Sequence, residues 1–95
     1  MRLAWSDVAK AELREVRAYS IARWSREVAA NYLVELRDSA SALAADPRRA
    51  RPVKGRFHLF RVRPHFLIVS IDSAADILTI ARVLHVTMDL DRHLP

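Results

Sequence analysis

Apolar residues recur every three or four positions through the first half of the chain, which is the spacing of one face of an α-helix. The first such segment covers residues 7–22, and its apolar positions are Ala9, Leu13, Val16 and Tyr19. Ser6 stands where an N-cap is expected, and Asp7 places a negative charge at the positive end of the helix dipole. The pattern therefore predicts an amphipathic helix over residues 7–22, preceded by a short apolar strand at residues 2–5.

A second helix is predicted between Ser25, a good N-cap, and Asp46-Pro47, because the residue before a proline disfavours helical backbone. Its apolar stripe consists of Ala29, Tyr32, Leu33, Leu36, Ala40, Leu43 and Ala44. Only residues 23–25 connect the two helices, so we expect an antiparallel helical hairpin. The stripes place Tyr19 and Tyr32 in the core, while Trp5 and Trp24 are expected to anchor the hairpin.

From Phe57 onward the period changes to two, which is typical of β-strands. Strands are predicted at residues 57–63, 66–71 and 77–84, and their short connections favour an antiparallel meander. The expected fold class is α+β, with the order β-α-α-β-β-β. The helical hairpin should pack on one face of a twisted antiparallel sheet whose other face stays open, and residues 85–95 are expected to include a short helix.

The composition of the chain excludes several classes of protein. With 95 residues and a mass of 10.9 kDa, the chain is expected to form one domain over residues 1–95. A hydrophobic content of 52% with a single glycine excludes disordered and collagen-like chains. The absence of cysteine excludes a disulfide scaffold, a thiol nucleophile and Cys-ligated zinc. Neither a membrane span nor a secretion signal is visible, so a soluble cytoplasmic protein without a membrane partner is expected.

The formal net charge of +5 is unevenly distributed along the chain. Residues 47–71 contain seven basic residues and no acidic residue, whereas the other 70 residues carry nine basic and eleven acidic residues. A block of one sign indicates an acidic partner such as nucleic acid, an acidic protein segment or anionic lipid. The first arginines of the block, Arg48, Arg49 and Arg51, are expected to lie in a solvated loop.

Three arginines within the predicted strands are the strongest candidates for a functional role. Strand alternation places Phe57, Leu59, Arg61 and Arg63 on one face of the sheet. The same rule places Arg82 on a face with Leu78, Ile80 and Leu84. An arginine on such an apolar face either forms an internal salt bridge, here with Asp89 or Asp91, or points into a cleft that receives an anion. Both alternatives stay open for Arg82.

The remaining polar residues give little support for catalysis or metal binding. None of the four histidines has metal-ligand spacing, no nucleophile elbow is present, and Gly55 alone cannot form a phosphate-binding loop. His85 follows the strand that carries Arg82 and could serve as a general base near a phosphate. The simpler alternative is a boundary histidine that is hydrogen-bonded to the backbone.

The C-terminal run from Ala81-Arg82-Val83-Leu84-His85 to Leu94 resembles the closing motif of ParE-type toxins. These toxins belong to the ParE/RelE superfamily of bacterial type II toxin–antitoxin systems. Further similarity lies in Arg23-Trp24, Tyr32-Leu33 and Asp46-Pro47, so the resemblance covers essentially the whole chain. It implies the fold of the superfamily, which has the β-α-α-β-β-β order predicted above.

The resemblance implies two alternative activities. RelE-type members are ribosome-dependent mRNA endonucleases, and the residues that would serve this reaction here are Arg61, Arg82 and His85. ParE-type members poison DNA gyrase by protein contact. Gyrase poisoning is favoured because no tyrosine follows Tyr32 and no glutamate follows Glu35. A plain nucleic-acid-binding module ranks third, because no aromatic stacking platform accompanies the basic block.

The resemblance also implies a partner that neutralises the toxin. We expect a ParD-like antitoxin, with a ribbon-helix-helix domain and an acidic tail, in a hetero-oligomeric complex; no cofactor or metal is expected. Exposed Phe57 and Leu59 beside the arginines suit a charged, partly apolar interface. The predicted partner-binding residues are Arg56, Phe57, Leu59, Arg61, Arg63, Arg82, His85, Met88 and Arg92.

Overall fold

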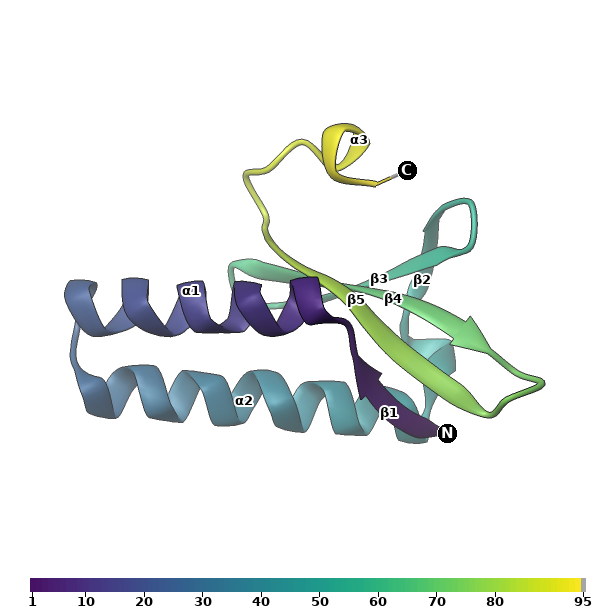
Figure 1. Cartoon of the computed structure of the whole chain (residues 1–95), viewed down its shortest axis with the longest axis horizontal. Coiled ribbons are helices and arrows are strands. Elements are labelled where there is room, and N and C mark those ends of the chain that lie inside the picture. The colour runs from purple at the N-terminus through teal and green to yellow at the C-terminus, as the bar shows by residue number, and fades with distance from the viewer. Residues whose placement is uncertain (95) are drawn as a thin grey trace.

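The computed structural model describes residues 1–94 and confirms the α+β class. Its elements are β1 (Arg2–Trp5), α1 (Asp7–Arg23), α2 (Arg26–Ala45), the 3₁₀ turn η1 (Pro47–Arg49), β2 (Arg51–Lys54), β3 (Phe57–Val62), β4 (His65–Asp72), β5 (Ile77–His85) and α3 (Leu90–His93). Figure 1 shows α1 and α2 lying side by side as an antiparallel hairpin. Among the described residues, no helix combines the length and the apolar character needed to cross a bilayer.

Both long helices begin and end where the sequence predicts. The Ala9 N–H donates to the Ser6 hydroxyl at 3.0 Å, and the Val28 N–H donates to the Ser25 hydroxyl at 3.1 Å. Each serine thereby satisfies one of the backbone donors that the first helical turn leaves without a partner. α2 ends at Ala45, just before Asp46-Pro47. The predicted helical hairpin is confirmed.

The sheet has five strands in the order β1-β5-β4-β3-β2. The predicted meander of β3, β4 and β5 is confirmed, but β1 pairs with β5 in parallel, so the sheet is mixed rather than antiparallel. β2 has no counterpart in the sequence prediction, which places Arg51 in a solvated loop together with Arg48 and Arg49. Residues 51–54 pair with β3 at the edge of the sheet, where Pro52 is tolerated because one side of an edge strand needs no hydrogen-bond donor. Arg48 and Arg49 lie in the exposed turn η1.

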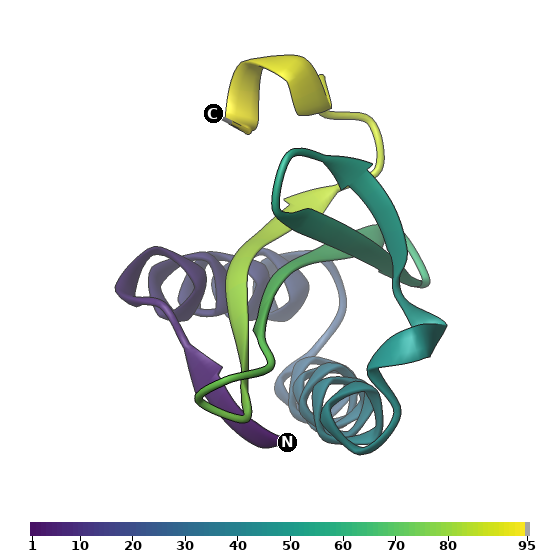
Figure 2. The ribbon, with the colours of Figure 1, turned by 90° about the vertical axis from the view of Figure 1, so that its right-hand side faces the viewer.

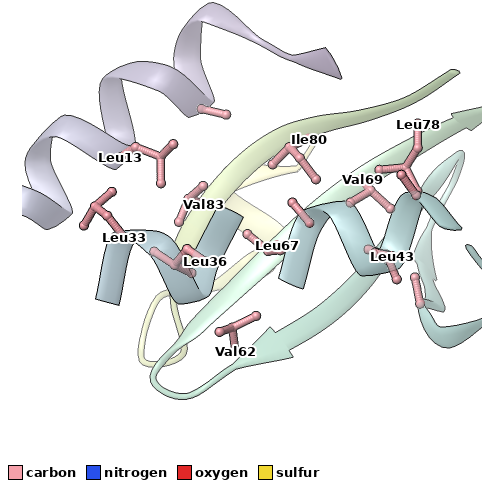
Figure 3. Close-up of a cluster of buried hydrophobic side chains, with 14 residues drawn as sticks. Leu13, Leu33, Leu36, Leu43, Val62, Leu67, Val69, Leu78, Ile80 and Val83 are labelled. Atoms are coloured by element: carbon pink, nitrogen blue, oxygen red, sulfur yellow. The ribbon is translucent and has the colours of Figure 1, made fainter. Parts of the chain in front are cut away.

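The main core lies between the helical hairpin and one face of the sheet. Leu13 from α1 and Leu33, Leu36 and Leu43 from α2 pack against strand residues. Figure 3 shows these leucines directed toward the side chains of the sheet, which include Val62, Leu67, Val69, Leu78, Ile80 and Val83. Burial of such side chains stabilises the fold by about 1.5–3 kcal/mol each.

The other face of the sheet is covered, which corrects the expectation of an open face. Leu94 packs there with Phe57, Leu59, Ile68 and Leu84 in a second cluster, and Leu90 of α3 packs against its side. Figures 1 and 2 both place α3 away from the two long helices. Phe57 and Leu59 are therefore only 7% and 3% exposed, so the prediction that they lie open to a partner is wrong.

A β-bulge in β5 changes the face on which its residues lie. Ile68 pairs with Arg82 while Val69 pairs with Ile80, so one extra residue, Ala81, is inserted in β5. Because strand alternation has a period of two, one extra residue reverses the faces on either side of it. Leu78 and Ile80 consequently pack against the helices, whereas Leu84 packs beneath α3. The predicted common face for Arg82, Leu78, Ile80 and Leu84 is wrong for this reason.

Candidate functional site

A groove of about 940 Å³ opens between the tip of the helical hairpin and the ends of β3 and β5. Its apolar part is formed by side chains that the core does not bury: Tyr19 is 64% exposed, Trp24 60%, Val28 46% and Met88 44%. Tyr19 and Trp24 also contact each other edge to face, with ring centroids 6.2 Å apart. These residues give the groove an accessible aromatic and aliphatic rim.

The positions of Tyr19 and Trp24 correct the sequence prediction, which assigned both to packing within the fold. Figure 1 shows the turn between α1 and α2 extending past the sheet, so residues near this tip have no strand beneath them. Tyr32 lies about one turn and a half past Arg26, the first residue of α2, and packs against the main core as predicted. Trp5 also packs against the main core. The short connection at Trp24 was the available sequence signal for its exposure, because it places Trp24 at the very tip of the hairpin.

A tyrosine and two histidines form a connected cluster on the floor of the groove. The Tyr32 hydroxyl lies 2.6 Å from His65 Nδ1 and 3.1 Å from the Val62 carbonyl oxygen. Tyr32 has a single hydroxyl proton, so it either donates to His65 Nδ1 or, with that proton directed to Val62, accepts a hydrogen bond from a protonated Nδ1. The His65 and His85 rings meet edge to face, with centroids 5.5 Å apart. None of the individual contacts of this cluster was predicted.

The environment shifts the pKa values of two members of this cluster. Burial, followed by the charge of Glu35, raises the pKa of Tyr32 to about 12. Burial, followed by repulsion from His85, lowers the pKa of His65 below its usual 6.5. His65 is therefore a neutral ring near pH 7, and its Nε2 makes no hydrogen bond to the described residues. Among those residues, no group of three histidines or acids is placed to hold a metal ion.

The segment that follows His85 fixes the orientation of its ring. The Thr87 N–H donates to His85 Nδ1 at 3.2 Å, and the Thr87 hydroxyl lies 2.8 Å from the same nitrogen. Because Nδ1 accepts a hydrogen bond from the backbone, the other ring nitrogen, Nε2, is the one left to face the groove.

Two arginines beside the groove form salt bridges with glutamates. Arg63, in the β3–β4 turn, forms a salt bridge with Glu35 of α2, and this contact raises the pKa of Arg63. Arg82 donates from Nε and from a terminal nitrogen to Glu12 of α1, at 2.9–3.2 Å, and also donates to the His93 carbonyl at 3.0 Å. The hydrogen bonds with Glu12 raise the pKa of Arg82. The internal ion pair is thus present, but with Glu12 rather than Asp89 or Asp91.

A second charged surface, called the basic edge below, follows η1, β2 and β3. It is defined by five exposed side chains: Arg49, Arg51, Lys54, Arg56 and Arg61. None of them forms a salt bridge with a carboxylate of the described residues. Figure 2 shows η1, β2 and the β2–β3 turn running up one side of the molecule. The basic block of the sequence therefore lies along this edge of the sheet, with Arg49 against Phe60 on the helix side and Arg56 against Phe57 on the α3 side.

The structure divides the predicted partner-binding residues among five places. Arg63, His85 and Met88 lie at the groove, while Arg56 and Arg61 lie on the basic edge. Phe57 and Leu59 are buried beneath α3. Arg82 is tied to Glu12, and Arg92 lies on α3, 3.8 Å from Asp89. One continuous patch of arginines bordered by apolar side chains is therefore not formed.

This fold and element order place the chain in a structural class that it shares with solved structures from toxin–antitoxin systems. A solved structure of the chromosomal ParDE toxin–antitoxin system from P. aeruginosa matches with a TM-score of 0.79 and 17% identity, over 90% of this chain and 95% of that chain. The RelBE2 toxin–antitoxin complex from Mycobacterium tuberculosis matches with a TM-score of 0.69 and 18% identity, over 88% and 95%. The YoeB/ParE toxin from Agrobacterium tumefaciens matches with a TM-score of 0.63 and 14% identity, over 90% and 98%.

Within that class, the chain belongs to the ParE toxin family of type II toxin–antitoxin systems. The family model described as the ParE toxin of the parDE system matches residues 3–90. Toxin ParE1 of Mycobacterium tuberculosis, found in two strains, is 31% identical over 96 aligned positions, covering 98% of this chain and 97% of the relative. The resemblance noted in the C-terminal run is thereby confirmed.

Proposed function

We propose that this toxin inhibits DNA gyrase in the cytoplasm through protein–protein contact, and that a ParD-like antitoxin neutralises it. The observation that carries this proposal is the open groove whose exposed rim includes Tyr19, Trp24, Val28 and Met88. Concave surfaces with aromatic anchors are typical of helix-in-groove recognition between proteins. Membership in the ParE family and similarity to a ParDE structure support this target and this partner.

The residues that line the groove indicate what kind of antitoxin segment would fit it. An amphipathic helix could place apolar side chains over Trp24, Val28 and Met88, with carboxylates toward Arg63 and the nearby exposed Arg61. Arg63 already has Glu35 as a partner, so an antitoxin carboxylate would share it rather than meet an isolated charge. Arg82 would act indirectly, by holding α1, β5 and the C-terminal segment together.

A plasmid-supercoiling assay tests this proposal. Purified toxin added to gyrase and relaxed plasmid should block supercoiling or yield linearised plasmid, and the cognate antitoxin should restore normal supercoiling. The variant Trp24→Ala should inhibit less, whereas Val34→Ala, an equally exposed position outside the groove, should inhibit normally. Unchanged supercoiling at an excess of folded toxin would refute the gyrase target.

RNA cleavage remains a second candidate because of His65. In the tautomer that carries its proton on Nδ1, the Nε2 of His65 could accept the proton of a 2′-hydroxyl as that oxygen attacks the phosphorus, while Arg63 offers positive charge nearby. The departing 5′-oxygen would need a proton, and the other histidine that lines the groove, His85, has its Nδ1 occupied by contacts with Thr87. This gap ranks RNA cleavage below protein contact.

Translating ribosomes separate the two candidates. Incubation with purified toxin should leave the mRNA intact if the toxin acts on gyrase. Codon-positioned cuts that disappear with His65→Ala, His85→Ala or Arg82→Ala would reverse the ranking.

A further inference from the structure

Apart from Arg61, which lies close to the groove residue Arg63, the cations of the basic edge have no role in the groove, and the composition of this surface differs from that of the groove. Its five cations lie around a short edge strand, in a stretch of the chain that contains no acidic residue. Surfaces that carry charges of both signs are the usual solvated faces of proteins, whereas a one-sign surface attracts a polyanion. The basic edge therefore indicates a binding partner different from the one that the groove binds.

The basic edge lacks the apolar anchors that an amphipathic peptide needs. Phe57 and Leu59 are buried beneath α3. The two aromatic rings nearest the cations are covered as well: the Arg49 guanidinium lies 5.1 Å from the centre of the Phe60 ring, and that of Arg56 lies 5.2 Å from the centre of the Phe57 ring. Single-stranded nucleic acid, whose bases stack on exposed aromatic side chains, is disfavoured for the same reason. A partner recognised through charge alone fits better.

The spacing of the cations suits the regular phosphates of a duplex. The irregularity between Pro52 and Lys54 sets Arg51 and Lys54 opposite Leu59 and Phe57, which are two residues apart, so at about 3.3 Å per residue the two cations stand about 7 Å apart along the sheet edge. A DNA duplex rises about 3.4 Å per base pair and carries one phosphate on each strand at every step. Arg51, Lys54 and Arg56 can therefore each meet a different phosphate.

We propose that the basic edge binds the phosphate backbone of double-stranded DNA, without sequence preference. The choice of DNA over other polyanions rests on the proposed function, because gyrase works on duplex DNA. Figure 1 shows the β2–β3 region and the tip of the helical hairpin at different ends of the molecule. The groove can therefore contact gyrase while the basic edge contacts the DNA that gyrase holds. A second weak contact of this kind raises the overall affinity through effective concentration.

Fluorescence anisotropy with a labelled DNA duplex of about 20 base pairs tests the proposal with toxin alone, over a series of salt concentrations. The triple variant R51Q/K54Q/R56Q removes three charges from the basic edge. The matched control K10Q/R14Q/R17Q removes three exposed charges from α1 and leaves the same net charge. Circular dichroism confirms that both variants are folded.

The wild type should bind with an affinity that falls steeply with salt. The edge variant should bind at least about tenfold more weakly in low salt, and the slope of its log affinity against log salt should be smaller by about three. The control variant should keep the wild-type slope. Equal losses in both variants, no binding by the wild type in low salt, or tighter binding to single-stranded DNA, duplex RNA or polyglutamate would each overturn the proposal. Since the assay contains no gyrase, its result is separate from that of the supercoiling assay.

Discussion

At the scale of single residues, Glu12 links α1 to both a side chain and the backbone of β5. Its carboxylate accepts hydrogen bonds from the Arg82 side chain and, at 2.9 Å, from the Val83 N–H. β1 pairs with β5 only as far as Ile80, so Glu12 satisfies a backbone donor that no strand reaches. An ion pair for Arg82 was one predicted alternative, but its partner lies 70 positions away in the chain. The parallel pairing of β1 with β5 brings Glu12 and Arg82 together, and the alternation of apolar residues along the strands does not reveal that pairing.

The substitution Glu12→Gln should destabilise the toxin by about 2 kcal/mol. It leaves the partly buried Arg82 without its counter-charge and weakens the hydrogen bonds to it. Urea unfolding monitored by tryptophan fluorescence measures the change. Glu15→Gln, on the exposed side of the same helix, should change stability by less than about 0.5 kcal/mol. Equal effects of the two substitutions would contradict the structural role of Glu12.

The lowered pKa of His65 predicts that the toxin loses stability in mild acid. The unfolded chain binds a proton near pH 6.5, whereas the folded chain binds it only at lower pH. The contribution of His65 is therefore complete above about pH 6.5 and is lost as the pH falls below that value. Urea unfolding between neutral pH and pH 5 measures it, and His65→Gln should flatten the dependence. An NMR titration that gives His65 a pKa above 6.5 would contradict this prediction.

At the scale of elements, the parts governed by local sequence could be predicted and the parts governed by long-range pairing could not. The helices have clear periodicity and serine caps, and β3, β4 and β5 are each six or more residues long and rich in β-branched, aromatic and other apolar residues. β2 is four residues long, contains Pro52 and offers only half-buried Val53 as an apolar signal. The bulge at Ala81 has no local marker, because it arises from the register between two strands. The packing of α3 on the sheet depends on Leu90 and Leu94 alone.

Leu94→Ala should cost about 2–4 kcal/mol of stability, a large effect for a residue so near the C-terminus. Leu94 is 5% exposed and fills the cluster that covers Phe57, Leu59 and Leu84. The midpoint of thermal or urea unfolding measures the loss. Val8→Ala, at a position that is 52% exposed, provides the control and should be nearly neutral. A neutral Leu94→Ala would mean that α3 does not hold the sheet face closed.

At the scale of the whole molecule, the toxin presents two unlike surfaces, an apolar groove at the hairpin tip and the basic edge beside β2. The sequence indicated the charge of the second surface through the one-sign block. It did not indicate the first, because Tyr19 follows the same helical stripe as buried Leu13, and periodicity cannot show where the sheet beneath a helix ends. The contact between His65 and Tyr32 was also not predictable from local sequence, because it joins α2 to the start of β4.

Trp24→Ala should weaken binding of the cognate antitoxin by about 30-fold, the equivalent of about 2 kcal/mol for an aromatic anchor. Because Trp24 is 60% exposed, the same change should alter the stability of the free toxin by less than about 0.5 kcal/mol. Isothermal titration calorimetry measures the affinity. Val34→Ala, which is outside the groove, should bind with wild-type affinity. Unchanged affinity for Trp24→Ala would place the antitoxin elsewhere.

The outer strands of the sheet have a consequence for how the toxin behaves without its partner. An unpaired strand edge invites copies of the same chain to join edge to edge and grow into fibrils. Here β2 is short and carries Pro52 together with Arg51 and Lys54, and where β5 continues beyond its pairing with β1 the Val83 N–H donates to the carboxylate of Glu12. Both features oppose self-association, so a toxin released from its complex should stay dispersed as single molecules.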